Sequence, residues 1–319
     1  METTLKKKNV IIDTDPGVDD AAAITLSLYD NVIDIKLITT VSGNLGVDVV
    51  TRNILHVLEK FNRTDIPVAV GASKPLFREP KTATFIHKSA GLGGYIPPEK
   101  VKTKPIKQDA VEAMYDVIKQ YPNDINIIAI GPHTNLAKLI QTHPDVKNLI
   151  SHIYTEGASP YYMRNQGRWS KHISFNASSD PEAVSIVINS NIPITYVPSR
   201  IGREYAHFTE KDVMKMAKIN NTGKFIHDMY SDYWEPGYQD KRVATNDTCA
   251  VLALRNPKLF KTKKVHMEVN TMSAPGRTII LPSKDGEINC VFGIHRRKMH
   301  KYFFNAIKKM SQFDKKSTE

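Results

Sequence analysis

The sequence predicts an α/β protein: a doubly wound, mostly parallel β-sheet flanked by helices, with additional helices and short strands in the C-terminal part. Two observations indicate this class and a single domain. Short apolar runs alternate with amphipathic segments between residues 9 and 197, an order that is typical of βαβ units. The chain also shows no internal repeat and no low-complexity linker across its 319 residues. We therefore expect one domain over residues 1–319, with a flexible basic tail from about 312 to 319.

Each expected element has a local signal. The strands are short apolar runs, several of them β-branched, at residues 9–12, 33–40, 125–130, 149–154 and 194–197, followed by short strands near 264–270, 277–281 and 288–292. Apolar side chains at helical spacing predict the helices 19–29, 47–61, 109–120, 135–141, 180–189 and 297–311. Open α/β sheets bind ligands at the carboxyl ends of their strands, so the polar residues that follow each strand are the candidates for a site.

The composition excludes several classes of protein. The formal net charge is +11, but the basic residues are spread over short clusters without interleaved aromatic residues, so we expect no nucleic-acid partner. The two cysteines, Cys249 and Cys290, are too few for a disulfide framework or a zinc cluster. The chain shows neither a run that could span a bilayer nor the apolar region of a secretory signal. These features predict a cytoplasmic protein without a membrane partner.

Four carboxylates lie within eight residues, directly after the first expected strand: Asp13, Asp15, Asp19 and Asp20. One or two of them could serve as caps at the start of the following helix. Four carboxylates so close together repel one another unless a cation lies between them. Calcium takes about 6 to 8 oxygen ligands from carboxylates, carbonyls and water. The cluster therefore predicts a Ca²⁺ site.

The segment 13–21, Asp-Thr-Asp-Pro-Gly-Val-Asp-Asp-Ala, resembles the signature of the inosine-uridine preferring nucleoside hydrolase family. Further segments resemble that family in the same order along the chain: 42–44, 71–76, 87–94, 130–137, 175–183 and 246–247. The resemblance implies a nucleoside hydrolase-like fold and hydrolysis of the N-glycosidic bond of a ribonucleoside or related ribosyl compound to free base and ribose, in purine and pyrimidine salvage. It also implies an oxocarbenium-like transition state and a homodimer or homotetramer.

The resemblance also implies a set of metal ligands. Asp15 and Asp20 would bind Ca²⁺ through their carboxylates. The backbone carbonyl of Ile130 and the carboxylate of Asp247 would complete the protein ligands. Asp13 would support these ligands without binding the metal ion itself.

A second set of roles concerns the sugar and the water. Asp15 would take a proton from the attacking water. Asp19 and Asn44 would hold the ribose hydroxyls, and Asn176 would contact the sugar. These residues would act on the ribosyl group and on the attacking water, and none of them would act on the departing base.

The leaving-group side departs from the family pattern. Asn246 stands where the family has His or Trp, and an amide is no general acid near neutral pH. His87, which matches a family His, is the alternative catalytic candidate, although a lone His is as often a structural residue. Trp234 could stack on the base. It belongs to a group of aromatic residues in a segment that we expect to be helical: Tyr230, Tyr233, Trp234 and Tyr238.

The sugar side departs as well. Ser174 stands where the family has a Glu that contacts the ribose, and the preceding segment is basic and includes Arg168. These changes suggest the hypothesis that Arg168 and Ser174 accommodate a 5′-phosphate or another anionic group, since the Arg fork suits phosphate. A solvated loop is the alternative.

Two other functions compete with an active hydrolase. A ribosyl-binding protein with little or no turnover is compatible with Ser174 and Asn246, although the intact set of carboxylates argues against it. A nicotinamide-dependent enzyme is disfavoured, because no G-x-G-x-x-G motif opens the first expected helix.

Overall fold

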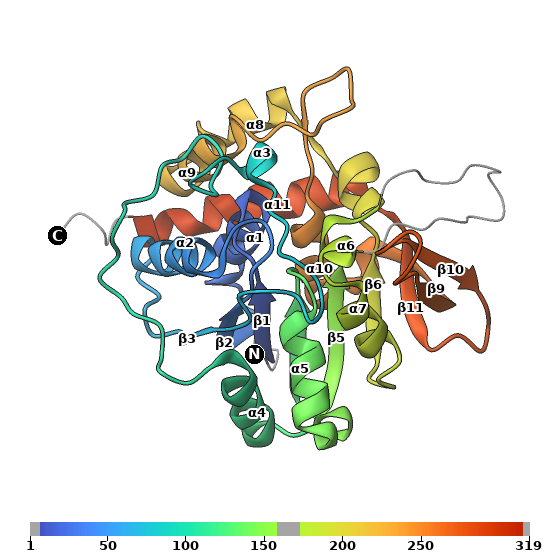
Figure 1. Ribbon diagram of the computed structural model, residues 1–319. Coiled ribbons are helices and arrows are strands. Elements are labelled where there is room, and N and C mark those ends of the chain that lie inside the picture. Colours follow the sequence, from blue (N-terminus) through green and yellow to red (C-terminus); the bar gives the residue numbers. More distant parts are fainter. Residues whose placement is uncertain (1–6, 158–172, 315–319) are drawn as a thin grey trace, which may run out of the picture.

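The computed structural model describes residues 7–157 and 173–314 (Figure 1). Its centre is a nine-stranded sheet in the order β10-β9-β11-β6-β5-β4-β1-β2-β3. The strands of this sheet are β1 (Lys8–Thr14), β2 (Ile33–Thr40), β3 (Val68–Val70), β4 (Ile125–Ala129), β5 (Ile150–Glu156), β6 (Ile194–Val197), β9 (Phe260–Val269), β10 (Thr278–Pro282) and β11 (Ile288–Ile294). A separate two-stranded pair joins β7 (Phe208–Thr209) to β8 (Arg242–Val243).

The sheet is mostly parallel, as the sequence predicts. Strands β1 to β6 and β11 pair in parallel with their neighbours, whereas β9 is antiparallel to both β11 and β10. The C-terminal strands therefore extend the central sheet. The chain order reverses between β1 and β4, and ligands bind at such a switch point in open α/β sheets.

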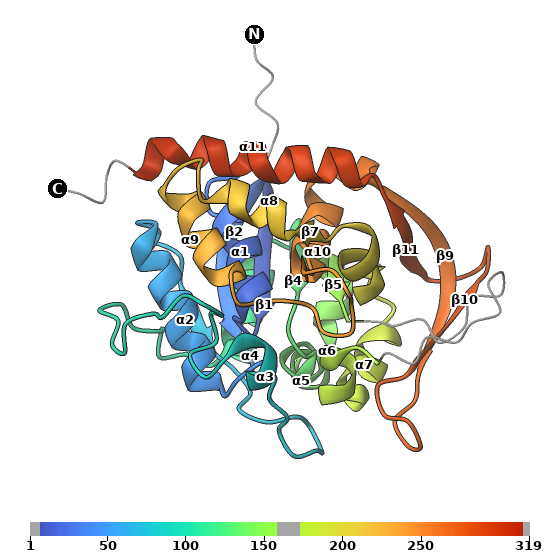
Figure 2. The same ribbon diagram turned by 90° about the horizontal axis from the view of Figure 1, so that it is seen from above.

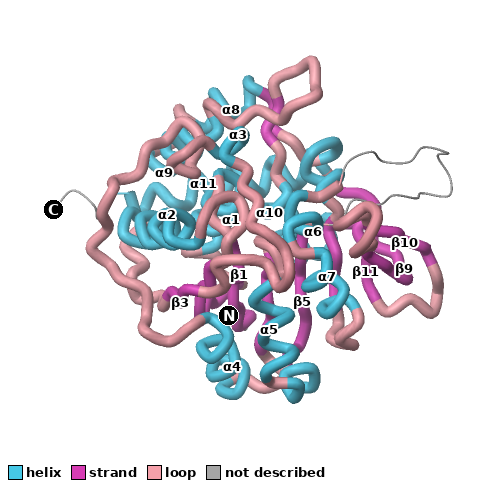
Figure 3. Tube along the Cα trace, viewed as in Figure 1, coloured by secondary structure: helices cyan, strands magenta, loops and turns pink. Residues whose placement is uncertain are grey.

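Helices cover both faces of the sheet (Figures 2 and 3). They are α1 (Val18–Ser27), α2 (Val47–Lys60), α3 (Thr84–His87), α4 (Ala110–Gln120), α5 (Thr134–Thr142), α6 (Phe175–Ser179), α7 (Pro181–Ile188), α8 (Glu210–Met216), α9 (Asn221–Tyr230), α10 (Asn246–Arg255) and α11 (Arg296–Asp314). One apolar core contains side chains of α1, α2, α9, α10 and α11, and the other contains side chains of α4, α5 and α7. Two separate cores on one sheet are the signature of a doubly wound fold.

Two expectations about the C-terminal half need correction. Helix α9 ends at Tyr230, so Tyr233, Trp234 and Tyr238 lie in the irregular segment 231–241 and not in a helix. Pro236 and Gly237 in that segment explain the early end, because neither residue favours a helix interior. Helix α11 ends at Asp314, whereas the expected helix ends at 311, and residues 315–319 lie outside the described residues.

No helix in residues 7–157 or 173–314 combines the length and apolarity needed to span a bilayer. The site is positioned by the strand ends instead. The parallel strands β1, β2, β4, β5 and β6 all finish at the same edge of the sheet. The residues at or just after these strand ends are therefore brought together there: Asp15, Asn44, Ile130, Glu156 and Ser199.

Candidate active site

The acidic turn between β1 and α1 is held by its own hydrogen bonds. Thr14 donates its hydroxyl to Asp20 Oδ1 at 2.6 Å, and the Gly17 amide donates to Asp20 Oδ2 at 3.1 Å. Asp19 and Asp20 lie in the first turn of α1, where the exposed amides of the helix end favour negative charge. The turn thus fixes Asp20 with both of its oxygens engaged.

Asp15 is held from β2 and is fully buried. The Asn44 amide donates to Asp15 Oδ2 at 2.6 Å, while Asp15 Oδ1 has no partner among the described residues. A Cβ atom at Gly43 would lie 2.1 Å from Asp15 Oδ2, so only glycine allows this approach of the β2 loop. An unpaired, buried carboxylate oxygen costs free energy and indicates that a ligand completes its environment.

Asp13 lies behind Asp15, at the end of β1. Its Oδ1 accepts hydrogen bonds from Thr39 at 2.6 Å and from Asn135 at 2.8 Å, and its Oδ2 has no partner among the described residues. Burial raises the pKa of Asp13 to about 6. Asn135 also binds the Thr40 carbonyl at 3.0 Å, so Asp13 belongs to the framework that joins β1, β2 and α5.

Three carboxylates converge at the edge of the sheet. Asp19, Asp20 and Asp247 have ligand oxygens that lie within 4.8 Å of one another, and all three are buried. Asp247 arrives from the first turn of α10. Burial raises the pKa of each, to about 7 for Asp19, and neighbouring carboxylates raise the pKa of Asp19 and Asp247 further. A positive charge between the three buried carboxylates would offset their mutual repulsion, so a divalent cation with oxygen ligands fits the group.

The Ile130 carbonyl faces the same place from the end of β4. It accepts a hydrogen bond from Asn176 Nδ2 at 2.7 Å. A carbonyl oxygen has a second lone pair that can bind a cation. Asn176 therefore orients Ile130, and both residues line the cavity.

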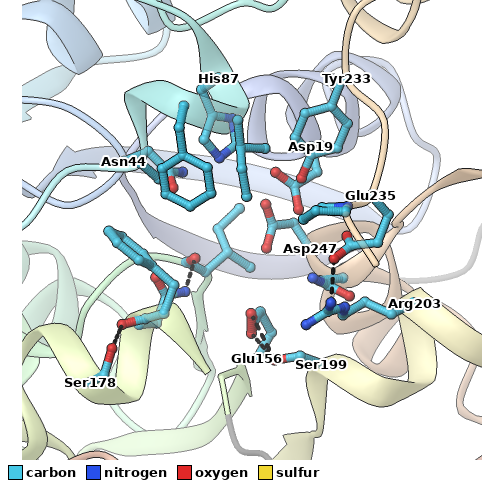
Figure 4. A pocket seen from close by; sticks show the side chains of 18 of the residues that line it. Asp19, Asn44, His87, Glu156, Ser178, Ser199, Arg203, Tyr233, Glu235 and Asp247 are labelled. Atoms are coloured by element: carbon cyan, nitrogen blue, oxygen red, sulfur yellow. Dashed lines mark hydrogen bonds and ion pairs between the residues drawn. The ribbon is translucent and has the colours of Figure 1, made fainter. Parts of the chain in front are cut away.

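The carboxylates open into a cavity of about 310 Å³ (Figure 4). Asp19, Asn44, His87, Tyr233 and Asp247 surround its upper and central part in that view. A cavity of this size suits a small molecule with a few polar groups.

His87 is oriented by the acidic turn. The Val18 amide donates to His87 Nδ1 at 3.1 Å, which makes Nδ1 an acceptor and leaves the proton on Nε2. Burial lowers the pKa of His87 to about 3. His87 is therefore a neutral hydrogen-bond donor and not a proton donor at neutral pH. Its ring lies 5.2 Å from that of Tyr233, centroid to centroid.

Asn246 lies at the start of α10, beside Asp247, and lines the cavity. Its Oδ1 has no partner in the described part of the chain. A Cβ atom at Gly202 would come within 2.3 Å of this oxygen, so the oxygen side of the amide faces the π-helical turn η2 (Ile201–Tyr205). This orientation leaves the NH₂ group as the part of Asn246 available to a ligand.

Among the described residues, two that the sequence suggests as substrate contacts, Trp234 and Ser174, are absent from the cavity lining. Trp234 packs at the edge of the core with Lys241 Nζ 5.3 Å from its ring centroid, and Tyr233 takes the place in the cavity. Ser174 is buried beside Gly157, and its hydroxyl has no partner in residues 7–157 and 173–314. Arg168 lies outside the described residues, so the structure gives it no position.

Sequence reasoning missed one wall of the cavity. Glu156, Ser199, Arg203 and Glu235 line it, and Arg203 forms an ion pair with Glu235 at 2.5 Å. Glu156 carried a usable signal, because it follows a buried strand just as Asp13 and Asp15 do. Arg203, in the π-helical turn η2, and Glu235, in the irregular segment 231–241, carried none, because they lie far from any recognisable motif.

The fold and the site together define an α/β protein with a cavity above buried carboxylates that could bind a metal ion. The inosine-uridine preferring nucleoside hydrolase family model matches residues 10–305. The chain is 34% identical over 273 residues to a protein of Escherichia fergusonii called non-specific ribonucleoside hydrolase RihC, covering 85% of this chain and 87% of that protein. A Salmonella typhi protein of the same name is 33% identical over 274 residues, with the same coverage of both chains.

Solved structures agree with the sequence comparisons. A plant nucleoside hydrolase, the PpNRh1 enzyme, superposes with a TM-score of 0.86 at 26% identity, covering 95% of this chain and 99% of that one. A purine-preferring ribonucleoside hydrolase from Gardnerella vaginalis gives the same TM-score at 24% identity, covering 96% and 99% of the two chains, and supports the fold. The chain belongs to the inosine-uridine preferring nucleoside hydrolase family, and it is an enzyme of the N-glycosyl hydrolase type.

Proposed function

We propose that the protein hydrolyses the N-glycosidic bond of a ribonucleoside to free base and ribose, and that this activity depends on Ca²⁺. One observation carries the proposal. Buried carboxylates converge at the carboxyl edge of the sheet, with an unpaired Asp15 oxygen, directly beneath a cavity of about 310 Å³. The names of the relatives support the substrate class.

The donor set favours a hard cation. Asp15, Asp20, Asp247 and the Ile130 carbonyl would hold Ca²⁺, since all four offer oxygen and none offers nitrogen or sulfur. Asp19 belongs to the same compact group of carboxylates and lines the cavity, so it faces both the cation and the substrate. A calcium ion bound there would supply Lewis acidity, which favours deprotonation of a water molecule near it.

The remaining steps belong to the residues of the chain. Asp15 Oδ1, the unpaired oxygen, would receive the proton of the attacking water. Asp19 would accept hydrogen bonds from the ribose hydroxyls, and Asn44 would bind them through Oδ1, because its Nδ2 already donates to Asp20 at 3.1 Å. These contacts orient the sugar with its reactive carbon toward the water.

The carboxylates would also stabilise the transition state. Cleavage of an N-glycosidic bond develops positive charge on the sugar ring. Asp15, Asp19 and Asp247 are fixed and shielded from solvent, and a preorganised negative field of this kind lowers the energy of a cationic transition state. The same field explains why the cavity suits a ribosyl group that becomes cationic.

The departing base would be assisted by hydrogen bonds without full protonation. His87 offers Nε2–H, and Asn246 offers its NH₂ group to the cavity. Tyr233 adds a ring surface next to His87. Bases that leave readily with hydrogen-bond assistance are therefore the preferred substrates.

The test measures base release by metal-free protein with and without Ca²⁺ on a panel of purine and pyrimidine nucleosides. We expect release that requires Ca²⁺ and that Asp247→Asn abolishes, while Asp48→Asn, at an exposed position in α2, leaves it unchanged. Ribose binding by calorimetry without base release would identify a ribosyl-binding protein and refute the proposal.

A further inference from the structure

Arg203 brings a positive charge into a cavity whose other charged side chains are carboxylates (Figure 4). Among the described residues that line the cavity, the only other basic side chain is His87, and burial lowers its pKa to about 3. The guanidinium group of an arginine, in contrast, stays protonated in proteins. Arg203 is therefore the one cation that a ligand meets in the described part of this cavity.

The backbone ties Arg203 to the residues proposed for the departing base. Arg203 lies in the π-helical turn η2, and such turns are rare and are often found at functional sites. A Cβ atom at the preceding Gly202 would lie 2.3 Å from Asn246 Oδ1 and 2.6 Å from the Asn246 backbone nitrogen, so the turn packs directly against the start of α10. Arg203 Nη2 also lies 2.5 Å from an oxygen of Glu235, which follows Tyr233 by two residues.

The ion pair between Arg203 and Glu235 is shielded from solvent. The side chain of Arg203 is 15% exposed and that of Glu235 is 9% exposed. Glu235 fixes the guanidinium group and offsets part of its charge. Because charges interact more strongly where water is excluded, the guanidinium group should act strongly on a ligand that touches it.

The proposed reaction needs a positive charge on the side of the base. Cleavage of the N-glycosidic bond leaves positive charge on the sugar and moves the bonding electron pair onto a nitrogen of the base. The carboxylates that stabilise the sugar repel these electrons. Asn246 cannot protonate the base, and the neutral His87 offers a hydrogen bond without a full charge. Arg203 supplies the charge that both residues lack.

We propose that the Arg203 guanidinium group donates a hydrogen bond to the departing base and stabilises the negative charge that develops on it, so that the base leaves as an anion. This inference rests on the proposed function and deepens it. The preferred bases carry a carbonyl oxygen or a ring nitrogen that accepts this hydrogen bond. A hydrogen bond from a charged donor is about twice as strong as one between neutral groups.

The proposed step balances in atoms and charge. The bond between the sugar carbon and the base nitrogen breaks, and its electron pair leaves with the base. The water oxygen forms the new bond to the sugar carbon, and one water proton passes to Asp15. The base anion takes up a proton from solvent, and Asp15 returns its proton to solvent.

The experiment compares two ribosyl substrates that differ in how much help the leaving group needs. One is the nucleoside that the enzyme hydrolyses best, and the other is 4-nitrophenyl ribofuranoside, whose nitrophenolate is already a stable anion. With Ca²⁺ present, Arg203→Gln should lower kcat/KM for the nucleoside by about 10- to 100-fold, the effect of one hydrogen bond from a charged group. It should lower kcat/KM for the nitrophenyl compound less than about threefold. An equal loss on both substrates would overturn the inference.

Two variants control for the ion pair and for the turn. Arg200 flanks the same turn and is paired with Glu204 at 2.5 Å, but it is not among the described residues that line the cavity. Arg200→Gln should therefore leave kcat/KM for both substrates within about twofold of the unmodified enzyme. Glu235→Gln keeps the positive charge of Arg203, so its loss on the nucleoside should be smaller than that of Arg203→Gln. The reverse order would assign the leaving group to Glu235 and refute the role of Arg203.

Two further measurements cover the cases in which the first comparison fails. If Arg203→Gln does not fold because Glu235 is left unpaired, the double variant Arg203→Gln/Glu235→Gln removes both charges and should show the same selective loss on the nucleoside. If the unmodified enzyme releases no base from any nucleoside, the proposed function fails. Calorimetry at pH 7.5 with uracil and with 5-nitrouracil, which is an anion at that pH, then tests Arg203 separately in the presence of Ca²⁺ and ribose. The unmodified protein should bind the anion about tenfold more tightly than uracil, and equal affinities would refute the role of Arg203.

Discussion

Calcium should stabilise the protein more at pH 7.5 than at pH 5.5. The perturbation is the addition of Ca²⁺ to metal-free protein at a concentration of about 100 times its dissociation constant at pH 7.5, which stabilises the folded state by about 2.7 kcal/mol. For a chain of 319 residues the entropy of unfolding is about 0.7 kcal/mol/K, so the shift in Tm is about 4 °C.

At pH 5.5 the same calcium concentration competes with protons. Burial raises the pKa of Asp19, a member of the converging group, to about 7, so about one molecule in thirty carries it ionised at pH 5.5. The apparent affinity falls about 30-fold, which leaves about 0.8 kcal/mol and a Tm shift near 1 °C.

The metal-free protein should show the opposite trend. The folded-state pKa values of Asp13 and Asp19 lie above their usual value of 3.8. The native state therefore retains protons that the unfolded chain has lost, and stability falls as the pH rises from about 4 to about 7. Metal-free protein should accordingly melt at a lower temperature at pH 7.5 than at pH 5.5.

The assay is differential scanning calorimetry of the metal-free protein in matched buffers with and without Ca²⁺. Asp20→Asn should remove the calcium shift, whereas Asp48→Asn, an exposed control, should keep it. A calcium shift of equal or greater size at pH 5.5 would refute the reasoning, as would a protein whose Tm ignores calcium at both pH values.

Three further predictions follow from single contacts. Gly43→Ala places a Cβ atom 2.1 Å from Asp15 Oδ2 and should lower the rate of calcium-dependent base release by roughly 5- to 150-fold. The control Gly46→Ala, whose Cβ atom meets nothing within 4 Å, should change that rate less than about twofold. Similar rates for the two variants would contradict this prediction. The Val18 amide donates to His87 Nδ1, and burial lowers the pKa of His87 to about 3. His87→Gln should therefore reduce kcat/KM without altering its pH profile between pH 5.5 and 8.5. If the unmodified enzyme showed a step in kcat/KM near pH 6.5 that the variant lacks, His87 would not be a neutral donor. Asn135→Ala removes three hydrogen bonds, to Asp13, to the Thr40 carbonyl and from the Ala72 amide. It should lower the free energy of unfolding by about 3 kcal/mol in urea titration, and a loss below about 1 kcal/mol would contradict this.

The fold was largely predictable because its signals are local. The expected strands 33–40 and 194–197 match β2 and β6, and the expected helix 19–29 begins one residue after the start of α1 at Val18. The order of the strands in the sheet was not accessible, because pairing between β1 and β4 joins residues that lie more than a hundred positions apart. The prediction of a helix for the irregular segment after α9 was also wrong, because the spacing of its aromatic residues is similar to that of residues on one face of a helix.

The carboxylate site was predictable for a related reason. Asp13, Asp15, Asp19 and Asp20 lie within eight residues, from the end of β1 to the start of α1, so a local pattern predicts that they lie close together. Asp247 joins them only through tertiary packing, and the sequence supplies it through family resemblance and not through spacing. The state of His87 was not predictable, because its tautomer depends on the Val18 amide, 69 positions away.

The sugar side shows why a local count of charge misleads. Ser174 in place of a glutamate, preceded by basic residues, suggested a pocket that had become more positive. In the folded chain Ser174 packs beside Gly157, so the carboxylate of Glu156 enters the cavity from the adjacent position on β5. A negative charge that is absent from one segment is present on the strand beside it. The sign of the charge that lines the cavity is therefore a property of the strand edge as a whole, and not of one segment of the sequence.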